Sequence, residues 1–549
     1  MIGTEGAWRW LVSIFVVLAV MSSGCSALDG LFREDCPVSD ATATGGKSGG
    51  ATGPGVGLNK PDLFIQYLGN ASGGRDNAAH QEAAHKKVTR AMAEKAIADA
   101  SDIGAPYLRV SATGFAPSAF QRPGDLDLWR NDPAAYWCLF DEMMNDLSSE
   151  DMKIVPVFVW NWTQFPAMTG ETVPQMMGDP DSESYRLLEA YITEFVRRYE
   201  DHPALYFYEL TNELNLSADL DMVGRCRNGE LGPPELCGPV GNFSTDQMIV
   251  FTSRLADHVR SLDTEHPVSS GFSMPRPYAE HLRREPEYSL SGPDFTPDSM
   301  TEFKDNLSDI HRHMDIVSVH FYNRKGNNER FGIEGHANAD LLNVVEQISD
   351  ELDKGLFVGE FGDVTPYVKD DKDALFTRNV LSKIAELKIP YSAPWVWEFY
   401  ETSPYRTHDR RNTYFTLEPG RTDIVISKIK EANEALGAPT PSSESPDNTL
   451  PRVVITRPLE GAQMPCNPSI HVVASDNSGE VSKVALLIDG EVEATRKTQP
   501  YRFGLESAQM GFGGQRITAK AYDRSGNVGQ YTVTAISGRS ILDPIFKGC

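Results

Sequence analysis

The sequence predicts an α/β fold class, with a (β/α)8 TIM barrel followed by an all-β Ig-like sandwich. Between residues 63 and 437, eight short apolar runs alternate with helical patterns, which is typical of parallel strands joined by crossover helices. From residue 453 onward the pattern changes to a period of two with frequent turn residues, as in a small β-sandwich. An open doubly wound sheet would carry a G-x-G-x-x-G turn after its first strand, and Gly69, Gly73 and Gly74 do not have that spacing.

The expected barrel strands are evenly spaced, and helical patterns fill the intervals between them. Leu188, Ile192 and Phe195 recur at helical spacing in one interval. Ser244 and Gln247 form a capping box at the start of the helix in a later interval. The expected strands are the runs 63–68, 107–111, 154–160, 205–210, 268–271, 316–320, 356–360 and 392–397.

The first 25 residues have the features of an export signal. Residues 11–20 are apolar but have only about half the length that crosses a bilayer. The three small residues before Cys25 resemble the cleavage box of lipoproteins, in which the cysteine is lipidated. The sequence therefore predicts an exported protein, at the cell surface or in the outer membrane or periplasm if Cys25 is lipidated, and secreted if the signal is simply cleaved.

Composition divides the chain into five segments. A signal peptide over residues 1–25 is followed by a flexible Gly/Ser/Thr-rich linker over 26–58. The barrel is expected over 59–437. A Pro/Ser linker over 438–451 separates it from the Ig-like sandwich over 452–549.

The charge balance limits the classes of partner. The chain has 549 residues, with 51 Lys and Arg against 77 Asp and Glu and a net charge of −26. Such a surface repels nucleic acid and anionic lipid, whereas a neutral partner, such as a β-linked polysaccharide or oligosaccharide, remains allowed. Membrane contact is expected only through a lipid at Cys25, and the protein is expected to be a monomer.

Seven cysteines occur in a chain whose predicted export would place it where disulfides persist. Cys226 and Cys237 bracket a loop rich in Gly and Pro and are the disulfide candidates. Cys138 follows Trp137 in an apolar helical pattern and is expected to be a buried free thiol. No spacing of cysteines or histidines indicates a metal site.

Polar residues at the C-terminal ends of barrel strands face the mouth of the barrel. The fourth run ends Y-E-L-T-N-E-L, which places Asn212 and Glu213 there, and the seventh ends L-F-V-G-E-F-G, which places Glu360 at the matching position. Two carboxylates facing one cavity are what glycosidic cleavage requires, because one protonates the leaving oxygen and the other attacks the anomeric carbon or activates water.

This order of residues resembles the retaining glycoside hydrolases of clan A, and the neighbouring residues resemble family five, with its cellulases and β-mannanases. The resemblance implies that Glu213 is the acid/base, that Glu360 is the nucleophile and that Asn212 binds the sugar 2-hydroxyl. It implies no cofactor and no metal. The corresponding activity is cleavage of β-1,4-linked mannan or glucan by double displacement.

Three further positions follow from the same resemblance. The run V-S-V-H-F-Y matches the family's His-x-Tyr, so His320 lines the site and Tyr322 donates a hydrogen bond to Glu360. Alternation along a strand places both side chains on one face. Arg109 stands where the family has an arginine that holds the nucleophile ionised.

Aromatic residues suit the apolar faces of sugar rings. Trp397 best matches the family's strand-eight tryptophan, although Trp395 lies on the same face and is an alternative. The run V-F-V-W-N-W is similar to the strand-three end of some β-mannanases, which makes Trp162 and Asn161 candidates. Many members carry histidine where Asn161 stands, so the preferred sugar stays open.

The C-terminal module resembles the bacterial Ig-like domains of secreted polysaccharide enzymes. Its segment has no Trp, so a spacer or stabilising role is favoured over sugar binding. For the whole chain, a non-catalytic surface protein that binds carbohydrate and a transglycosylase on the same scaffold are the alternatives. The sequence does not separate endo from exo action.

Overall fold

The computed structural model describes most of the barrel and the sandwich. It covers residues 54–68, 90–113, 124–231, 237–322, 331–333, 335, 337–363, 371–398, 416–438, 449–464, 468–476, 481–497, 501–505, 513–523 and 527–537. The predicted signal peptide, with Cys25, lies outside the described residues, so export stays a prediction.

The barrel is one parallel sheet of nine strand segments in the order β1-β9-β8-β7-β6-β5-β4-β3-β2. Its two end segments are consecutive pieces of one strand, because only Gly57 separates them. One piece pairs with β9 and the other with β3, and this closes the barrel. The segments are β1 (Gly55–Val56), β2 (Leu58–Asn59), β3 (Tyr107–Ser111), β4 (Lys153–Val159), β5 (Tyr208–Thr211), β6 (Val268–Ser269), β7 (Ile316–Tyr322), β8 (Gly355–Gly362) and β9 (Tyr391–Pro394).

The prediction for the first strand is wrong. Residues Leu63–Leu68 form helix α2, and all six of them are buried. A short apolar run does not distinguish a buried strand from a buried helix by periodicity. The true first strand is the segment 55–59, which lies in the predicted linker except for its last residue. Its two-residue pieces around a glycine give no strand pattern. The other seven runs each overlap a strand.

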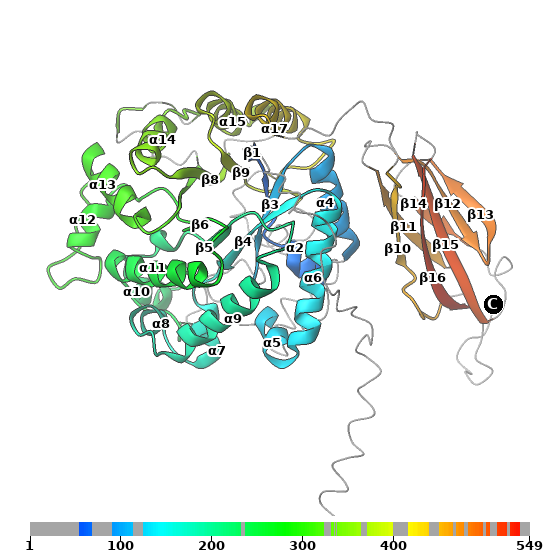
Figure 1. Ribbon diagram of the computed structural model, residues 1–549, viewed down its shortest axis with the longest axis horizontal. Coiled ribbons are helices and arrows are strands. Elements are labelled where there is room, and N and C mark those ends of the chain that lie inside the picture. Colours follow the sequence, from blue (N-terminus) through cyan, green and yellow to red (C-terminus); the bar gives the residue numbers. More distant parts are fainter. Residues whose placement is uncertain are drawn as a thin grey trace, which may run out of the picture.

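Helices surround the barrel, as Figure 1 shows. The predicted capping box at Ser244 and Gln247 is present and begins α11. No helix in the described part of the chain is long and apolar enough to cross a membrane. The helices after α2 are α4 (Arg90–Asp102), α5 (Gly124–Asn131), α6 (Pro133–Ser149), α7 (Gln164–Thr169), α8 (Val173–Gly178), α9 (Glu183–Tyr199), α10 (Met222–Arg227), α11 (Thr245–Leu262), α12 (Ala279–Arg284), α13 (Met300–His311), α14 (Leu341–Glu351), α15 (Leu375–Leu387) and α17 (Asp423–Leu436), with short 3₁₀ turns at Leu214–Leu216 and Asp371–Asp373.

The inside of the barrel is layered. Because side chains alternate along a strand, Tyr107 and Arg109 on β3 share a face, as do Phe207 and Glu209 at β5. Tyr107 and Phe207 belong to an apolar floor. Arg109 and Glu209 form a polar layer above this floor, toward the C-terminal ends of the strands. The floor consists of Tyr107, Val155, Phe207, Ile316, Phe357 and Ala393, with Tyr206 and Tyr391 packed against it.

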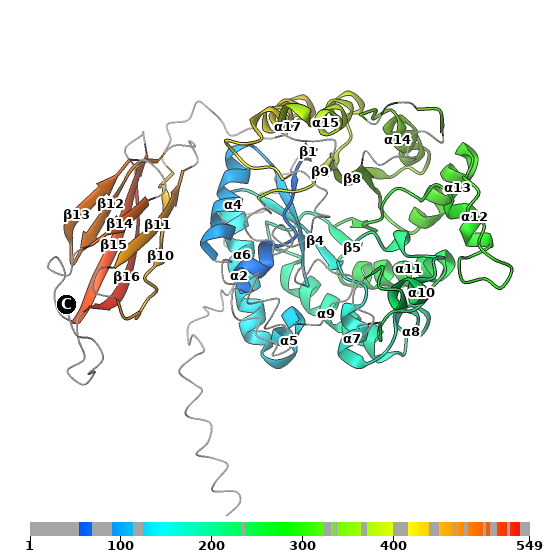
Figure 2. The ribbon, with the colours of Figure 1, turned by 180° about the vertical axis from the view of Figure 1, so that it is seen from behind.

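The C-terminal region consists of two antiparallel sheets packed around one core, as predicted. One sheet has the order β10-β11-β14 and the other β13-β12-β15-β16. The sandwich lies beside α4, on the side of the barrel away from α12 and α13 (Figure 2). Its strands are β10 (Arg452–Arg457), β11 (Ser469–Ser475), β12 (Val481–Ile488), β13 (Glu491–Arg496), β14 (Tyr501–Gly504), β15 (Gly513–Asp523) and β16 (Val528–Ser537).

Two predictions about cysteines have different outcomes. The structure joins Cys226 and Cys237 in a disulfide, with their Cα atoms 5.9 Å apart. Cys138 is disulfide-bonded as well, so the prediction of a free thiol is wrong. Although Trp137 beside it is buried, Cys138 itself is half-exposed on α6 and therefore accessible to a partner.

Candidate active site

Glu213 and Glu360 face one another across His320 at the mouth of the barrel. His320 Nδ1 lies 3.1 Å from Glu213 Oε1 and 3.6 Å from Glu360 Oε1. A carboxylate oxygen of Glu213 lies within 4.8 Å of one of Glu360. The Glu213 side chain is 32% exposed and that of Glu360 only 6%, so solvent reaches one carboxylate much more readily than the other.

A bulge in β8 turns Glu360 into the barrel. Phe357 faces the floor, and strict alternation would send residue 360 to the opposite face. The pairing of β8 with β7 shifts register between Val319 and His320, which inserts Gly359 as an extra residue. A Cβ at Gly359 would lie 3.1 Å from His320 Nε2, so the bulge also needs a residue without a side chain.

The backbone at Glu213 is held in a left-handed conformation with φ of 50°. Its N–H donates to the carbonyl of Gly271 at 2.8 Å. Gly271 has φ of 74°, and a Cβ there would come within 1.7 Å of the Thr211 carbonyl oxygen. The close approach of these two strand ends, which only glycine permits, therefore fixes the direction of Glu213.

Arg109 is fully buried, and each of its three guanidinium nitrogens donates a hydrogen bond. Nη1 donates to Asn59 Oδ1 at 2.9 Å and to Glu360 Oε1 at 2.8 Å. Nη2 donates to Asn212 Oδ1 at 2.7 Å and approaches Glu209 Oε1 at 2.5 Å, while Nε donates to the same Glu209 oxygen at 2.6 Å. Every edge of the planar guanidinium is thereby fixed.

Tyr322 and His320 complete the surroundings of Glu360. The Tyr322 hydroxyl donates to Glu360 Oε2 at 2.6 Å, so both oxygens of this carboxylate accept hydrogen bonds. Burial lowers the pKa of His320 to about 3, so the ring is neutral at neutral pH. As the sequence predicts, alternation along β7 places both side chains at the site.

Sequence reasoning missed two members of this site, Glu209 and Asn59. Burial raises the pKa of Glu209 to about 7, against the opposing effect of Arg109. The run Y-E-L-T-N-E contained a signal for its position, because Glu209 and Thr211 are two residues apart on β5 and therefore point to the same, inner face of the barrel. Asn59 is the first residue of the predicted barrel, ahead of its first predicted strand, and there no pattern indicated it.

The structure overturns the preferred tryptophan. Trp397 is fully buried in the outer core, and its Nε1 donates to the Ala96 carbonyl at 2.9 Å. Trp395, the alternative, is half-buried and stacks on Trp160 with ring centroids 6.0 Å apart. The Trp160 ring in turn lies 4.8 Å from the Arg109 guanidinium. Since β9 ends at Pro394, alternation does not extend to Trp397.

Two other predicted contacts lie in supporting positions. Trp162 is 8% exposed and packs edge-on against Phe243 in the core. Asn161 Oδ1 accepts hydrogen bonds from the N–H and the hydroxyl of Thr163, which closes the turn after β4. These contacts shape the loop after strand three.

Glu213, His320 and Glu360 have a spacing that could hold a metal ion, as have His281, Asp298 and Glu302. In the first group Arg109 already places a positive charge 2.8 Å from Glu360. In the second group Asp298 accepts hydrogen bonds from the first backbone N–H groups of α12, and Glu302 accepts from Ser299 and Arg284. Both sets of oxygens are therefore engaged by protein donors.

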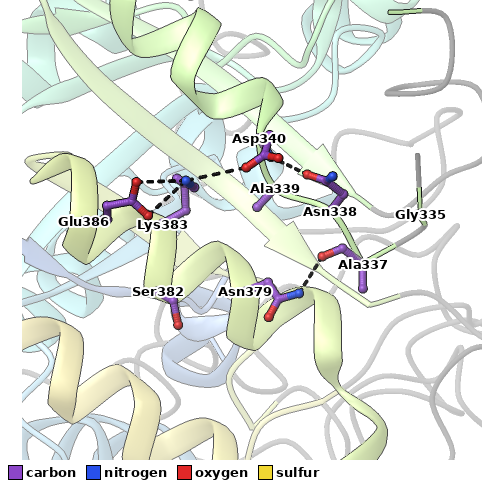
Figure 3. A pocket seen from close by; sticks show the side chains of 9 residues that line it. All are labelled: Gly335, Ala337, Asn338, Ala339, Asp340, Asn379, Ser382, Lys383 and Glu386. Atoms are coloured by element: carbon purple, nitrogen blue, oxygen red, sulfur yellow. Dashed lines mark hydrogen bonds and ion pairs between the residues drawn. The ribbon is translucent and has the colours of Figure 1, made fainter. Parts of the chain in front are cut away.

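A separate hollow of about 510 Å³ lies between the start of α14 and α15 (Figure 3). Lys383, its cationic side chain, is paired with Asp340 at 3.6 Å and with Glu386 at 2.9 Å. No aromatic side chain lines it, and none of the candidate catalytic residues does. It is lined by Gly335, Ala337, Asn338, Ala339, Asp340, Asn379, Ser382, Lys383 and Glu386.

Comparisons with known proteins give a family match for the C-terminal part of the chain and a partial match to one curated enzyme. Residues 451–535 match the family described as the bacterial Ig domain, which confirms the prediction for the C-terminal part. A stretch of 139 residues is 27% identical to the probable mannan endo-1,4-beta-mannosidase C of Aspergillus terreus. That match covers 24% of this chain and 31% of the relative, so it spans about a third of the curated protein's length.

Solved structures that the chain matches include an endo-mannanase and a mannosidase. The endo-beta-1,4-mannanase of Thermotoga petrophila is 14% identical, with a TM-score of 0.44 over 89% of this chain and 99% of that one. A glycoside hydrolase family 5 mannosidase of Rhizomucor miehei is 12% identical, with a TM-score of 0.44 over 70% and 94%. The Aspergillus relative agrees with the resemblance that the motifs indicate.

Proposed function

We propose that this chain is an exported glycoside hydrolase that cleaves β-1,4-linked mannan or a related β-glycan with retention of configuration. The observation that carries the proposal is the pair of Glu213 and Glu360, whose oxygens approach within 4.8 Å across His320. Retaining enzymes place their carboxyl groups about 5–5.5 Å apart, whereas inverting enzymes leave about 6.5–9.5 Å for a water molecule. The name of the Aspergillus relative supports mannan as the first substrate to test.

The surroundings of the two carboxylates assign their roles. Glu360 accepts hydrogen bonds from Arg109 and Tyr322, which hold both of its oxygens in one orientation, as a nucleophile requires. Glu213 is more exposed and has the neutral His320 beside it. It is therefore the group that can exchange a proton with a leaving oxygen and then with water.

The reaction then proceeds in two displacements. Glu360 attacks the anomeric carbon while Glu213 gives its proton to the departing glycosidic oxygen, and a glycosyl ester forms on Glu360. In the second step Glu213 takes a proton from water, the oxygen of that water attacks the same carbon, and Glu360 is released. A sugar hydroxyl in place of water would give transglycosylation. The half-buried Trp395, stacked on the buried Trp160, offers a ring face next to this centre.

The first test is hydrolysis of β-mannan, glucomannan, carboxymethylcellulose and xylan by wild type, Glu213→Gln and Glu360→Gln. We expect cleavage by wild type and a loss of at least about a thousandfold in each variant. Glu302→Gln is the matched control, because it changes a carboxylate of the other histidine-carboxylate group. Proton NMR of the first product reports the configuration. No cleavage of any polymer favours the binding-protein alternative, and an inverted product refutes retention.

Export and lipidation are part of the proposal and have their own test. The support is the short apolar stretch 11–20 and the small residues before Cys25. Labelling with a fatty acid probe in a bacterial host should modify wild type and leave Cys25→Ser unlabelled. A cleaved but unlabelled wild-type protein would support simple secretion.

A further inference from the structure

Glu209 lies next to Arg109 and takes no part in the two displacements described above. Its side chain is fully buried, and its Oε1 lies 2.6 Å from Arg109 Nε and 2.5 Å from Nη2. The hydroxyl of Ser269 lies 3.5 Å from its Oε2. Glu209 therefore shares with Glu360 the same guanidinium, each carboxylate on a different edge.

One positive charge serves two buried carboxylates. Arg109 carries that charge, and His320, which also faces Glu360, is neutral at neutral pH. Burial raises the pKa of Glu209 to about 7, and the charge of Glu360 adds to that rise. One guanidinium balances only one carboxylate, so below neutral pH Glu209 is the carboxyl of this cluster that holds a proton.

The covalent stage of the proposed reaction disturbs this balance. When Glu360 becomes a glycosyl ester it loses its negative charge, and Arg109 would be left as a buried cation without a counter-ion. Such a state is strongly unfavourable in a protein interior. Glu209, already in contact through two N–H groups, is the carboxyl that can replace the lost charge.

We propose that Glu209 is a positioning residue that acts as the reserve counter-ion of Arg109 while Glu360 is esterified, an inference that rests on the proposed function. As the bond from Glu360 to the anomeric carbon forms, the leaving oxygen departs with the electron pair of the broken bond. Glu209 then releases its proton to solvent and binds Arg109 as a carboxylate. When water cleaves the ester, Glu360 regains its charge and Glu209 takes up a proton.

The test measures protons released as the ester forms. Glu213→Gln enzyme is mixed with 2-deoxy-2-fluoro-β-mannobiosyl fluoride, whose fluoride leaves without needing a proton. Mass spectrometry of the intact protein counts esters, and a pH indicator in weak buffer counts protons, at about pH 6, roughly one unit below the pKa of Glu209. We expect close to one proton per ester from Glu213→Gln and none from Glu213→Gln/Glu209→Gln.

The control is Asp263→Asn in the same Glu213→Gln background. Asp263 is a buried carboxylate that binds the Tyr208 hydroxyl and His266, so its loss should leave the release unchanged. Ester formation without proton release, or with equal release from the Glu209→Gln double variant, overturns the inference and leaves the proposed function standing. Absence of ester in every variant, together with no polymer cleavage by wild type, overturns both.

A second measurement does not depend on the folding of Glu209→Gln. In Glu213→Gln alone, the release should fall toward zero above about pH 8, because Glu209 is then ionised before the ester forms. A release that stays constant between about pH 6 and pH 8 contradicts the inference. A purely structural Glu209 would produce no proton release at either pH.

Discussion

Two groups of carboxylates in this molecule, one buried and one largely half-buried, differ in how their charge is balanced. One surrounds Arg109 inside the barrel. The other lies where the sandwich meets the barrel and includes Asp102 and Glu150, with Asp476 close by. Its cation, Arg452, is 31% exposed and pairs with Glu150 at 3.0 Å, whereas Arg109 is fully buried and donates from each of its three guanidinium nitrogens.

The difference shows what a well-placed cation does for a buried acid. Burial raises the pKa of Asp102 to about 8, and the charges of Asp99, Glu150 and Asp476 add to the rise. The positive charge of Lys430 opposes this rise in the pKa of Asp102, although no contact between the two side chains is found in the described part of the chain. In the barrel, a guanidinium in direct contact holds two carboxylates in place. At the contact with the sandwich, Asp102 has no such guanidinium contact in the described part of the chain, and its pKa is raised further from the ordinary value than that of Glu209.

The largest effect should come from removing the barrel cation. In Arg109→Met, Glu209 and Glu360 keep their burial and lose their shared partner, so we expect a loss of about 3–5 kcal/mol in the free energy of unfolding. Glycosidase activity should fall at least about a thousandfold, because the nucleophile loses its support. Urea denaturation and kcat/KM on mannan measure the two effects. A loss below about 1 kcal/mol in the free energy of unfolding would show that Arg109 stabilises its carboxylates no more than a partly exposed cation does at the sandwich.

A smaller and more local effect is expected for Tyr322→Phe. This change removes one hydrogen bond to Glu360 and leaves Arg109 in place. Because the bond is charge-assisted, kcat/KM should fall about 10- to 1000-fold, while the free energy of unfolding changes by about 1–2 kcal/mol. Comparing the two variants separates the hydrogen bond from the ion pair. An activity loss equal to that of Arg109→Met would mean that hydrogen bonding, not charge, supports the nucleophile.

How far the sequence predicts this site depends on whether a strand keeps its alternation. His320 and Tyr322 lie on the regular β7, and their shared face follows from a period of two. Glu360 lies beyond a bulge and was placed by the motif around it, because alternation from Phe357 would have turned it outward. Trp397 was misplaced since the strand before it ends early.

The contacts that no local pattern encodes were the ones missed. Glu209 becomes important only because Arg109 lies opposite, 100 residues away along the chain. Asn59 belongs to a strand of two short pieces, whose stability comes from closing the barrel between β9 and β3. Such residues depend on tertiary packing, which composition and periodicity do not report.

Titration should distinguish the contact at the sandwich from the barrel cluster. Asp102 binds its proton more tightly in the folded protein, so it weakens the fold as pH rises from about 4 toward 8. At pH 9, the free energy of unfolding of Asp102→Asn should therefore exceed that of wild type by about 2 kcal/mol. At pH 4 the two proteins should be nearly equal, because Asp102 in the folded protein is then neutral, as Asn is. Urea denaturation across this range measures the difference. A gain that is the same at both pH values would contradict the role of the Asp102 charge.

The smallest effect should come from Arg452→Met, which removes the cation that pairs with Glu150 where the sandwich meets the barrel. Its ion pair with Glu150 is partly exposed, and its Nη2 also donates to the Ser149 hydroxyl at 2.6 Å. We expect a loss of less than about 1 kcal/mol that shrinks further in high salt, because solvent and ions screen such a pair. A salt-insensitive loss of about 3 kcal/mol or more would place Arg452 in the same class as Arg109. The sandwich would then be held to the barrel as rigidly as Glu209 and Glu360 are held inside it.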